Sequence, residues 1–222
     1  MKNNSIFLVV FLIASAIQLV GAVIEMPLMQ DLSKPVIMIS LMGYYWMEAE
    51  KRSGIFILAL LFCWAGDVLL IFQPQAEWFF IFGLVAFLVG HLFYMISYSK
   101  FMTTDKTNEL LWTQKIRYSL PLILIGTGLI TILFPKLGAL KIPVLIYSMV
   151  LVGMTMTALF RYGRTTSQSF WMVFLGAVLF MVSDSLLAIN KFYSPLPMAG
   201  FLIMFTYISA QYFIVAGVLR HK

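Results

Sequence analysis

The sequence predicts an all-α, polytopic membrane protein with eight transmembrane helices and both termini in the cytoplasm. Its 222 residues are 62% apolar and only 11% charged, whereas a soluble domain is about 25% charged. Eight apolar stretches follow one another with short, turn-rich connections, and basic residues gather in alternate connections. Because one span takes about 20 residues, eight spans use the whole chain, and we expect a single integral membrane domain over residues 1–222.

The expected spans are read from the apolar stretches in chain order. The first follows Lys2 as in a signal peptide, but its length and the lack of a small-x-small cleavage site indicate a retained span. The second is short, and aromatic residues from Tyr44 to Trp46 extend it at the interface. The eight ranges are 5–24, 35–47, 54–72, 77–99, 116–134, 142–160, 169–189 and 197–219.

The orientation follows from the distribution of lysine and arginine between the two sides. Eleven lie on the side of the termini, and Lys34, Lys136, Lys141 and Lys191 lie on the other. This bias places both termini in the cytoplasm, which for a bacterial chain means the inner membrane. The net charge of +6 reflects basic loops facing anionic lipid and does not indicate nucleic-acid binding. The eleven are Lys2, Lys51, Arg52, Lys100, Lys106, Lys115, Arg117, Arg161, Arg164, Arg220 and Lys222.

The scarce cysteine and histidine exclude several kinds of site. Cys63 is the single cysteine, and His91 and His221 are the two histidines, so the chain has neither a disulfide framework nor a zinc cluster. No P-loop, GxSxG, HExxH or CxxC pattern occurs. We therefore expect no metal and no cofactor, and chemistry carried by side chains within the spans.

Two acidic residues, Asp67 and Asp184, lie inside expected spans, while the other seven lie in loops or at span ends. A carboxyl group in the membrane is costly and marks a candidate functional site, although a structural hydrogen bond between helices is the alternative. Both lie about six residues, or roughly 9 Å, from the non-cytoplasmic end of their spans. We expect them to share one layer, with Gly66 and Gly176 allowing neighbouring helices to approach closely.

Further polar residues could complete a site in the same region. Lys34 opens the second span on the non-cytoplasmic side, where its ammonium group could hold a phosphate. His91 either packs in a glycine-lined helix contact or serves as a proton shuttle or head-group ligand. Buried tyrosine and glutamine need hydrogen-bond partners and could line a polar cavity; these are Tyr94, Tyr147, Tyr207 and Gln211.

Two neighbouring buried carboxyl groups can hold one proton between them, so that one is an acid and the other a carboxylate. Such a pair suits hydrolysis through an oxocarbenium-like state. An intramembrane aspartyl protease is disfavoured because Trp64-Ala65-Gly66-Asp67 lacks the first glycine of GxGD. A proton-coupled transporter of a lipid or small amphiphile is the main alternative, although the two halves show no repeat.

Five motifs, in order, resemble those of the YhhN-like lysoplasmalogenase family over nearly the whole chain. They are Ser33-Lys34-Pro35, the run from Leu61 to Leu70 with Gly66-Asp67, Gly83-Leu84 followed by the run from Phe87 to Tyr94, the run from Gly176 to Ser185, and Tyr207 through Gln211. Cys63-Trp64 departs slightly from the family pattern. The resemblance implies hydrolysis of the vinyl ether bond of lysoplasmenyl-ethanolamine or -choline, without a metal.

The products implied by this resemblance are a fatty aldehyde and a glycerophospho-base. Asp67 and Asp184 would supply the general acid and the water-activating carboxylate, with the assignment between them open. Lys34 would bind the phosphate, and Ser183 would orient Asp184. His91, Tyr94, Tyr147, Tyr207 and Gln211 would line the pocket. The implied partners are a lysophospholipid and the bilayer, and the sequence indicates no oligomeric state.

Overall fold

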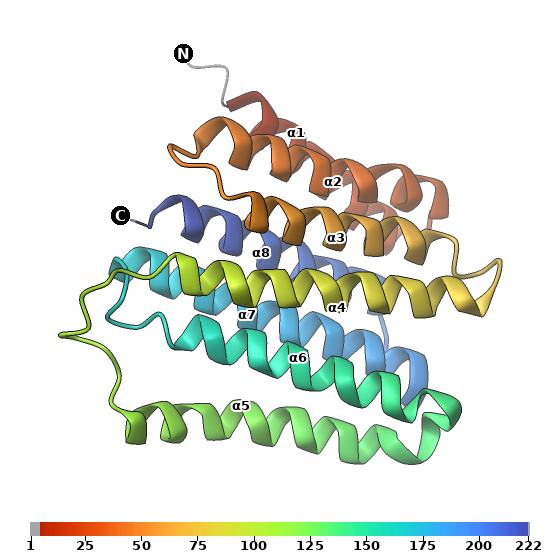
Figure 1. Ribbon diagram of the computed structural model, residues 1–222. Coiled ribbons are helices and arrows are strands. Elements are labelled where there is room, and N and C mark those ends of the chain that lie inside the picture. The colour runs from red at the N-terminus through yellow and green to blue at the C-terminus, as the bar shows by residue number, and fades with distance from the viewer. Residues whose placement is uncertain (1–4, 222) are drawn as a thin grey trace. The chain divides into compact units, whose positions relative to one another are not determined.

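The computed structural model describes residues 5–221 as eight α-helices joined by short loops (Figure 1). Within these residues there is no strand, so the all-α prediction is confirmed. Two basic residues of the predicted charge bias, Lys2 and Lys222, lie outside the described range. A π-helical turn, Ile189–Tyr193, directly continues α7. The helices are α1 Ser5–Val23, α2 Pro27–Glu48, α3 Gly54–Ile71, α4 Glu77–Lys100, α5 Trp112–Leu133, α6 Lys141–Leu159, α7 Ser167–Ala188 and α8 Ala199–Leu219.

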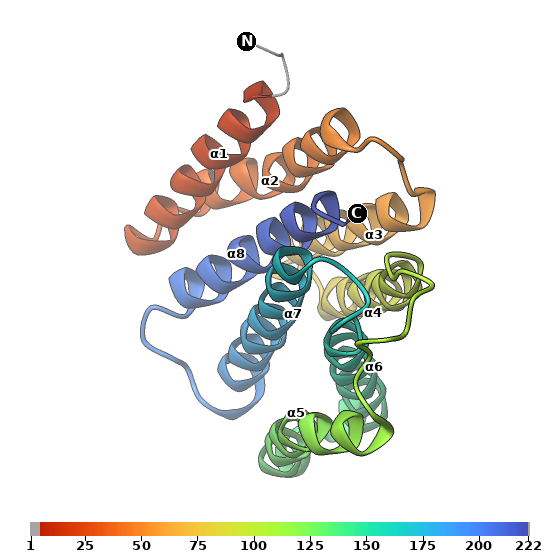
Figure 2. The same ribbon diagram turned by 90° about the vertical axis from the view of Figure 1, so that its left-hand side faces the viewer.

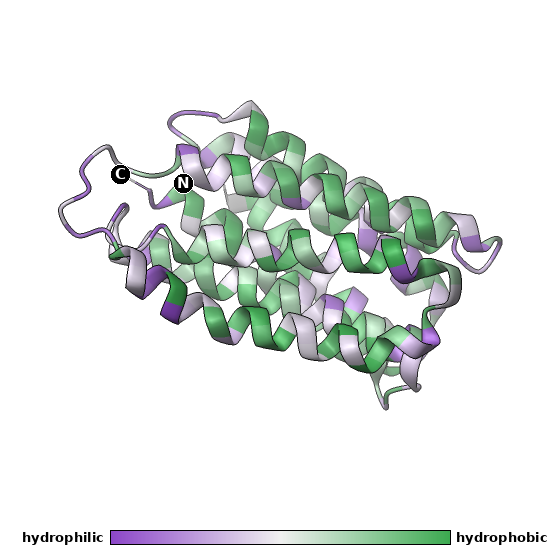
Figure 3. Ribbon diagram, turned by 60° about the horizontal axis from the view of Figure 1, so that its bottom comes forward, coloured by the Kyte–Doolittle hydropathy of each residue, from purple (hydrophilic) through white to green (hydrophobic). Residues whose placement is uncertain are grey.

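Seven of these helices are long and apolar enough to cross a membrane, and the protein is a multi-pass membrane protein. The helices are mostly apolar along their length, and the hydrophilic residues gather at the loops (Figure 3). The remaining helix, α2, has 22 residues but contains Gln30, Asp31 and Lys34, which lower its hydropathy. The eighth span therefore stays a proposal.

The start of α2 differs from the sequence prediction. Lys34 and Pro35 do not open the second helix, because α2 begins at Pro27, two turns earlier. Proline is favoured at the first helical position, where its missing N–H is not needed. Pro35 then removes only the one bond that its N–H would make to the carbonyl of Asp31. Lys34 consequently lies inside the helix and is half-buried.

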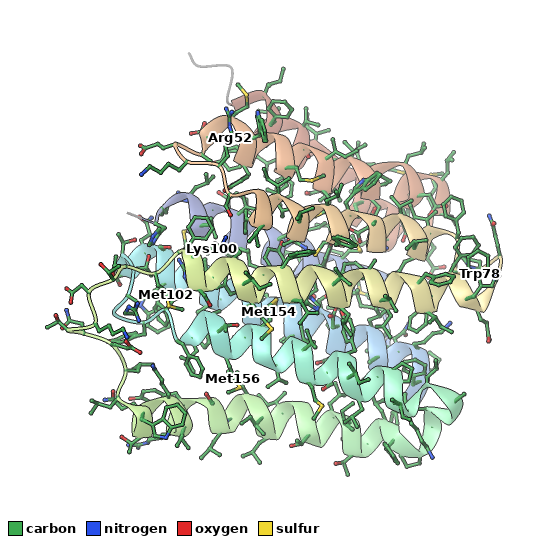
Figure 4. All side chains as sticks on the ribbon, in the orientation of Figure 1. Arg52, Trp78, Lys100, Met102, Met154 and Met156 are labelled. Atoms are coloured by element: carbon green, nitrogen blue, oxygen red, sulfur yellow. The ribbon has the colours of Figure 1, made fainter. Side chains whose placement is uncertain are left out.

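The chain forms two compact units, one ending at Tyr94 and one beginning at Met95. In the first unit, Arg52 and Trp78 mark opposite ends (Figure 4). Arg52 lies over the ring of Trp46, 4.4 Å from its centroid. Helices α3 and α4 meet at Gly66, where an added Cβ would lie 2.6 Å from the Phe87 ring. The predicted close approach at Gly66 is confirmed.

In the second unit, α7 and α8 pack side by side as an antiparallel pair (Figure 2). A Cβ on Gly176 would lie 2.8 Å from the carbonyl oxygen of Ala210. Because that neighbour is backbone and cannot turn away, only glycine allows this approach. The prediction for Gly176 is therefore also confirmed.

Helix α5 packs against α6 near Gly126. A Cβ on Gly126 would lie 2.6 Å from Val152 of α6. Met156 extends from α6 toward α5, whereas Met154 is fully buried (Figure 4). Both methionines fill space between helices, which suits an unbranched, flexible side chain.

Arg161 joins the ends of three helices in the second unit. Its side chain is fully buried, and it donates to the carbonyl oxygen of Phe101 after α4 (3.3 Å) and to Ser169 Oγ on α7 (2.8 Å). Ser169 Oγ in turn donates to the carbonyl oxygen of Gly217 near the end of α8 (2.7 Å). Arg161, which follows α6, therefore joins the end of α4 to the start of α7, and Ser169 joins α7 to the end of α8. Burial lowers the pKa of Arg161 to about 10, so it stays charged at neutral pH.

Candidate functional site

Asp67 lies in the first unit, near the C-terminal end of α3. It is 2% exposed and lies four residues before Ile71, where the helix ends. The adjacent Gly66 brings the Phe87 ring of α4 against the same turn. The local sequence thus buries this carboxyl group about 6 Å from the helix end.

Lys34 and Ser33 lie on α2 of the same unit. Ser33 is buried, and its Oγ donates to Gln18 Oε1 of α1 at 2.7 Å. This bond between two polar side chains joins α1 to α2 next to Lys34. The residue before Lys34 is therefore fixed by a hydrogen bond to α1, which also fixes the backbone from which the ammonium group extends.

His91 and Tyr94 occupy consecutive turns of α4, and both are fully buried. The Tyr94 ring packs on Phe56 of α3, with centroids 5.7 Å apart. Gly90 faces α3 as well, because a Cβ there would lie 3.0 Å from Cys63 Sγ. The glycine-lined helix contact predicted for this stretch is present, and a chemical role for His91 stays a prediction.

Asp184 lies in the second unit, four residues before the α-helical part of α7 ends at Ala188. The hydroxyl of Tyr147 on α6 donates a hydrogen bond to Asp184 Oδ2 at 2.5 Å. Tyr147 is buried and Asp184 is half-buried. One turn of π-helix follows α7, a feature that is frequent at functional sites.

The π-helical turn and the loop after it are held by polar contacts. Lys136 Nζ donates to the carbonyl oxygen of Tyr193 at 3.0 Å and lies over its ring. The backbone N–H of Leu196 donates to Asn190 Oδ1 at 2.9 Å. The segment beyond Asp184 is therefore fixed to α7 and to the end of α5.

Two predicted residues pair on α8. Gln211 Nε2 donates to the hydroxyl oxygen of Tyr207 at 3.3 Å, and both side chains are buried. The Tyr207 ring meets Phe180, one turn before Asp184, edge to face at 5.4 Å. The expectation that these residues need polar partners is met by this pair.

Ser183 lies next to Asp184 on α7 and contacts the neighbouring helix. Its hydroxyl donates to the carbonyl oxygen of Ile203 on α8 at 3.0 Å, so in this structure it fixes α7 against α8. The bond also positions the turn that carries Asp184.

The predicted residues thus fall into two sets. Asp67, Lys34, His91 and Tyr94 belong to the first unit. The second unit holds Tyr147, Ser183, Asp184, Tyr207 and Gln211, which link α6, α7 and α8. Within residues 5–221, no three His, Cys, Asp or Glu side chains are grouped to hold a metal ion.

Comparison with known proteins decides the family. The sequence model of the YhhN family matches residues 29–218. The chain belongs to the YhhN family. The resemblance carried by the five motifs is therefore confirmed, and the match includes every candidate site residue from Lys34 to Gln211.

Several relatives of this YhhN-family chain carry the name lysoplasmalogenase. Lysoplasmalogenase TMEM86B of Mus musculus is 31% identical over 186 residues, which cover 82% of the chain and 71% of the mouse protein. Lysoplasmalogenase TMEM86A of Homo sapiens is 26% identical over a region that covers 81% of the chain and 71% of the human protein. A lysoplasmalogenase of Mycobacterium tuberculosis is 31% identical over a region that covers 72% of the chain and 58% of the mycobacterial protein. No solved structure matches the chain.

The bond between Tyr147 and Asp184 was not predicted for this YhhN-family chain, although the sequence contains a signal for it. Helices α6 and α7 are antiparallel neighbours joined by a short loop. Residues at similar distances from that loop face one another, as Arg161 and Ser169 do near it and Thr155 and Ala177 do farther along. Extending this register leads to Tyr147 and Asp184.

Proposed function

We propose that this protein is a lysoplasmalogenase, an alkenyl-ether hydrolase that cleaves the vinyl ether bond of lysoplasmenyl-ethanolamine or -choline. The names of its relatives support this activity. The observation that carries the chemistry is the half-buried carboxyl group of Asp184 with its hydrogen bond from Tyr147. A second buried carboxyl group, that of Asp67, supplies the other half of an acid–base pair.

The reaction adds one water to the vinyl ether. Protonation of the β-carbon gives an oxocarbenium ion, water attacks the carbon next to the ether oxygen, and the hemiacetal collapses to a fatty aldehyde and a glycerophospho-base. The first step needs a general acid and the second a carboxylate that takes a proton from water. After these steps the carboxylate holds the proton taken from water and the general acid has lost its own, so a proton passes from the first to the second, through water, before the next turnover.

The two carboxyl groups receive different roles in this proposal. Asp184 Oδ2 accepts the hydrogen bond of Tyr147, and a hydrogen bond donated to a carboxyl oxygen favours the ionised form. We therefore assign water activation to Asp184 and proton delivery to Asp67. Lys34 binds the phosphate as a point charge, and His91, Tyr94, Tyr207 and Gln211 line the pocket.

The test is a lipid-product assay on purified protein. Asp67→Asn and Asp184→Asn should insert normally and release no aldehyde from lysoplasmenyl-ethanolamine in micelles. Near-native turnover by either variant would exclude that residue's role. Proton flux in sealed vesicles that depends on the amphiphile, without any hydrolysis, would instead support the transporter.

A rescue experiment separates the two roles. Formate can replace a missing carboxylate, so it should restore aldehyde release in Asp184→Ala and leave Asp67→Ala inactive. Rescue of Asp67→Ala alone would reverse the assignment. The protein without substitutions, measured at the same formate concentration, controls for effects on the micelle.

A further inference from the structure

A groove in the second unit lies far along α7 from Asp184. It has a volume of about 760 Å³ and is formed by the first half of α5, the end of α6, the start of α7 and residues 107–111. Its walls are largely aromatic: Tyr118, Tyr162, Phe170, Trp171 and Phe174. Phe170 stacks on Phe174 at 5.7 Å and meets Tyr162 edge to face at 5.2 Å. Trp171 and Asp184 are 13 residues apart on one helix, about 20 Å, so the groove is separate from the proposed reaction site.

One end of the groove is polar, and Glu109 is the charged side chain that lines it. Behind this carboxylate lie two cations that do not line the groove: Lys115 bonds to Glu109, and Arg164 bonds to it at 2.9 Å. One carboxylate thus faces two cations. Lys115 has three N–H donors and among residues 5–221 uses one of them on Glu109. The surrounding segments, residues 100–117 and 161–164, contain six basic and two acidic residues.

The other end of the groove is apolar and lies along the membrane-spanning part of the helices. From Leu111 to Pro121 the groove follows α5 for ten residues, about 15 Å. This length is about half the thickness of the hydrocarbon core, which is one leaflet. An apolar hollow that extends along lipid-facing helices is filled by hydrocarbon and not by water.

We propose that this groove binds an anionic phospholipid of the surrounding leaflet, with one acyl chain against the aromatic walls and the phosphate at Lys115. The length of the groove matches one chain, and the polar end matches the charge of the head group. The site differs from the proposed reaction site in its residues and in its position along α7. It therefore holds a bound membrane lipid and not the lipid that is hydrolysed.

Native mass spectrometry of the purified full-length protein tests this, with phosphatidylglycerol and phosphatidylcholine of identical chains as probes. Phosphatidylglycerol should bind more tightly. Lys115→Gln should weaken its binding about fivefold and remove the preference, and Lys115→Arg should restore it. The matched control is Arg117→Gln, an exposed basic residue of α5 that, unlike Lys115, is not paired with the lining residue Glu109, and this variant should bind like the unmodified protein.

The aromatic wall has its own matched pair. Trp171 lines the groove and is 58% exposed, whereas Trp112 is 75% exposed and does not line it. Trp171→Ala should weaken the binding of both lipids, whereas Trp112→Ala should leave the binding of both unchanged. Equal behaviour of these two variants, unchanged binding by Lys115→Gln, or full displacement of the lipid by inorganic phosphate would overturn the proposal. Aldehyde release is measured in parallel. If the variants change lipid binding as expected but the protein releases no aldehyde, only the proposed function is refuted.

Discussion

Tyr147 is the residue whose contact bears most directly on the chemistry. Its hydroxyl reaches Asp184 from the neighbouring helix α6, so it orients the carboxyl group without belonging to the same element. A hydrogen bond to a charged group contributes about 1.5–3 kcal/mol. In the proposed reaction, the position of this single hydroxyl therefore affects the rate, and its bond also contributes to holding α6 against α7.

We expect Tyr147→Phe to lower kcat by about 10- to 100-fold, because Asp184 loses its positioning bond. The measurement is aldehyde release under saturating substrate. Tyr193→Phe is the control, since the exposed Tyr193 keeps its ring over Lys136 and should leave kcat unchanged. If Tyr147→Phe retained full turnover while unfolding at a lower temperature, the bond would be structural only.

Candidate site residues could be identified from the sequence where they interrupt an apolar stretch. Asp67 and Asp184 are found because a carboxyl group in an apolar run is exceptional. Arg161 was counted only as a loop charge, because nothing in the sequence separates a buried arginine after a helix from an exposed one. Its position depends on carbonyl groups of α4 and α8, and such long-range contacts are absent from local composition.

At the scale of elements, the helix pair α7–α8 depends on glycine. An added methyl group at Gly176 meets backbone atoms of α8 at 2.8–2.9 Å. Gly176→Ala should therefore destabilise the protein by about 1–3 kcal/mol. Gly128→Ala is the matched control, because nothing lies within 4 Å of its added Cβ, and it should be neutral or stabilise by up to about 1 kcal/mol.

Thermal unfolding of both glycine variants in the same detergent measures the difference. A lower midpoint for Gly176→Ala than for Gly128→Ala is expected. Equal midpoints would mean that α7 and α8 can separate without cost, and the close approach would then contribute nothing to stability.

The loop between α4 and α5 should depend on pH. Hydrogen bonds from Lys115, followed by nearby positive charge, hold the pKa of Glu109 below its ordinary value of 4.5, and Thr107 lowers the pKa of Asp105. Because the folded pKa is the lower one, the contribution of Glu109 to anchoring the loop is complete above pH 4.5. It is lost as the pH falls through the lowered pKa.

A nitroxide label at the exposed Asn108 reports this release, with Asn108→Cys made in a Cys63→Ser background. Its mobility should stay low from pH 7 to 5 and rise below pH 4.5. Adding Glu109→Gln should make the label mobile already at pH 7 and reduce the pH response. A label equally mobile at every pH would show that the ion pairs do not anchor the loop.

Element boundaries were predictable to within a few residues wherever hydropathy changes sharply, as at Gly54 and Ile71 of α3. The start of α2 was missed because Asp31, Ser33 and Lys34 read as a loop. Helix α2 nevertheless continues through them, since Ser33 finds Gln18 as a buried partner. Helix propensity and hydropathy describe local sequence only, so they cannot predict this contact between two helices.

For the whole molecule, we propose that both termini and the loops around Arg52, Lys106 and Arg164 face the cytoplasm, because these loops carry most of the basic residues. In a Cys63→Ser background, Gln75→Cys should react with an impermeant maleimide in intact cells. Lys106→Cys should react only after permeabilisation. The opposite labelling would reverse the orientation, and labelling of both sites in intact cells would contradict α4, the helix between them, as a span.

The hydrogen bond between Tyr147 and Asp184 also has a consequence for biosynthesis. The chain is made from its N-terminus, so α6 enters the membrane before α7. The hydroxyl of Tyr147 then enters the membrane before Asp184, whose carboxyl group is costly to insert without a polar partner. The order of the helices therefore supplies the partner of Asp184 first.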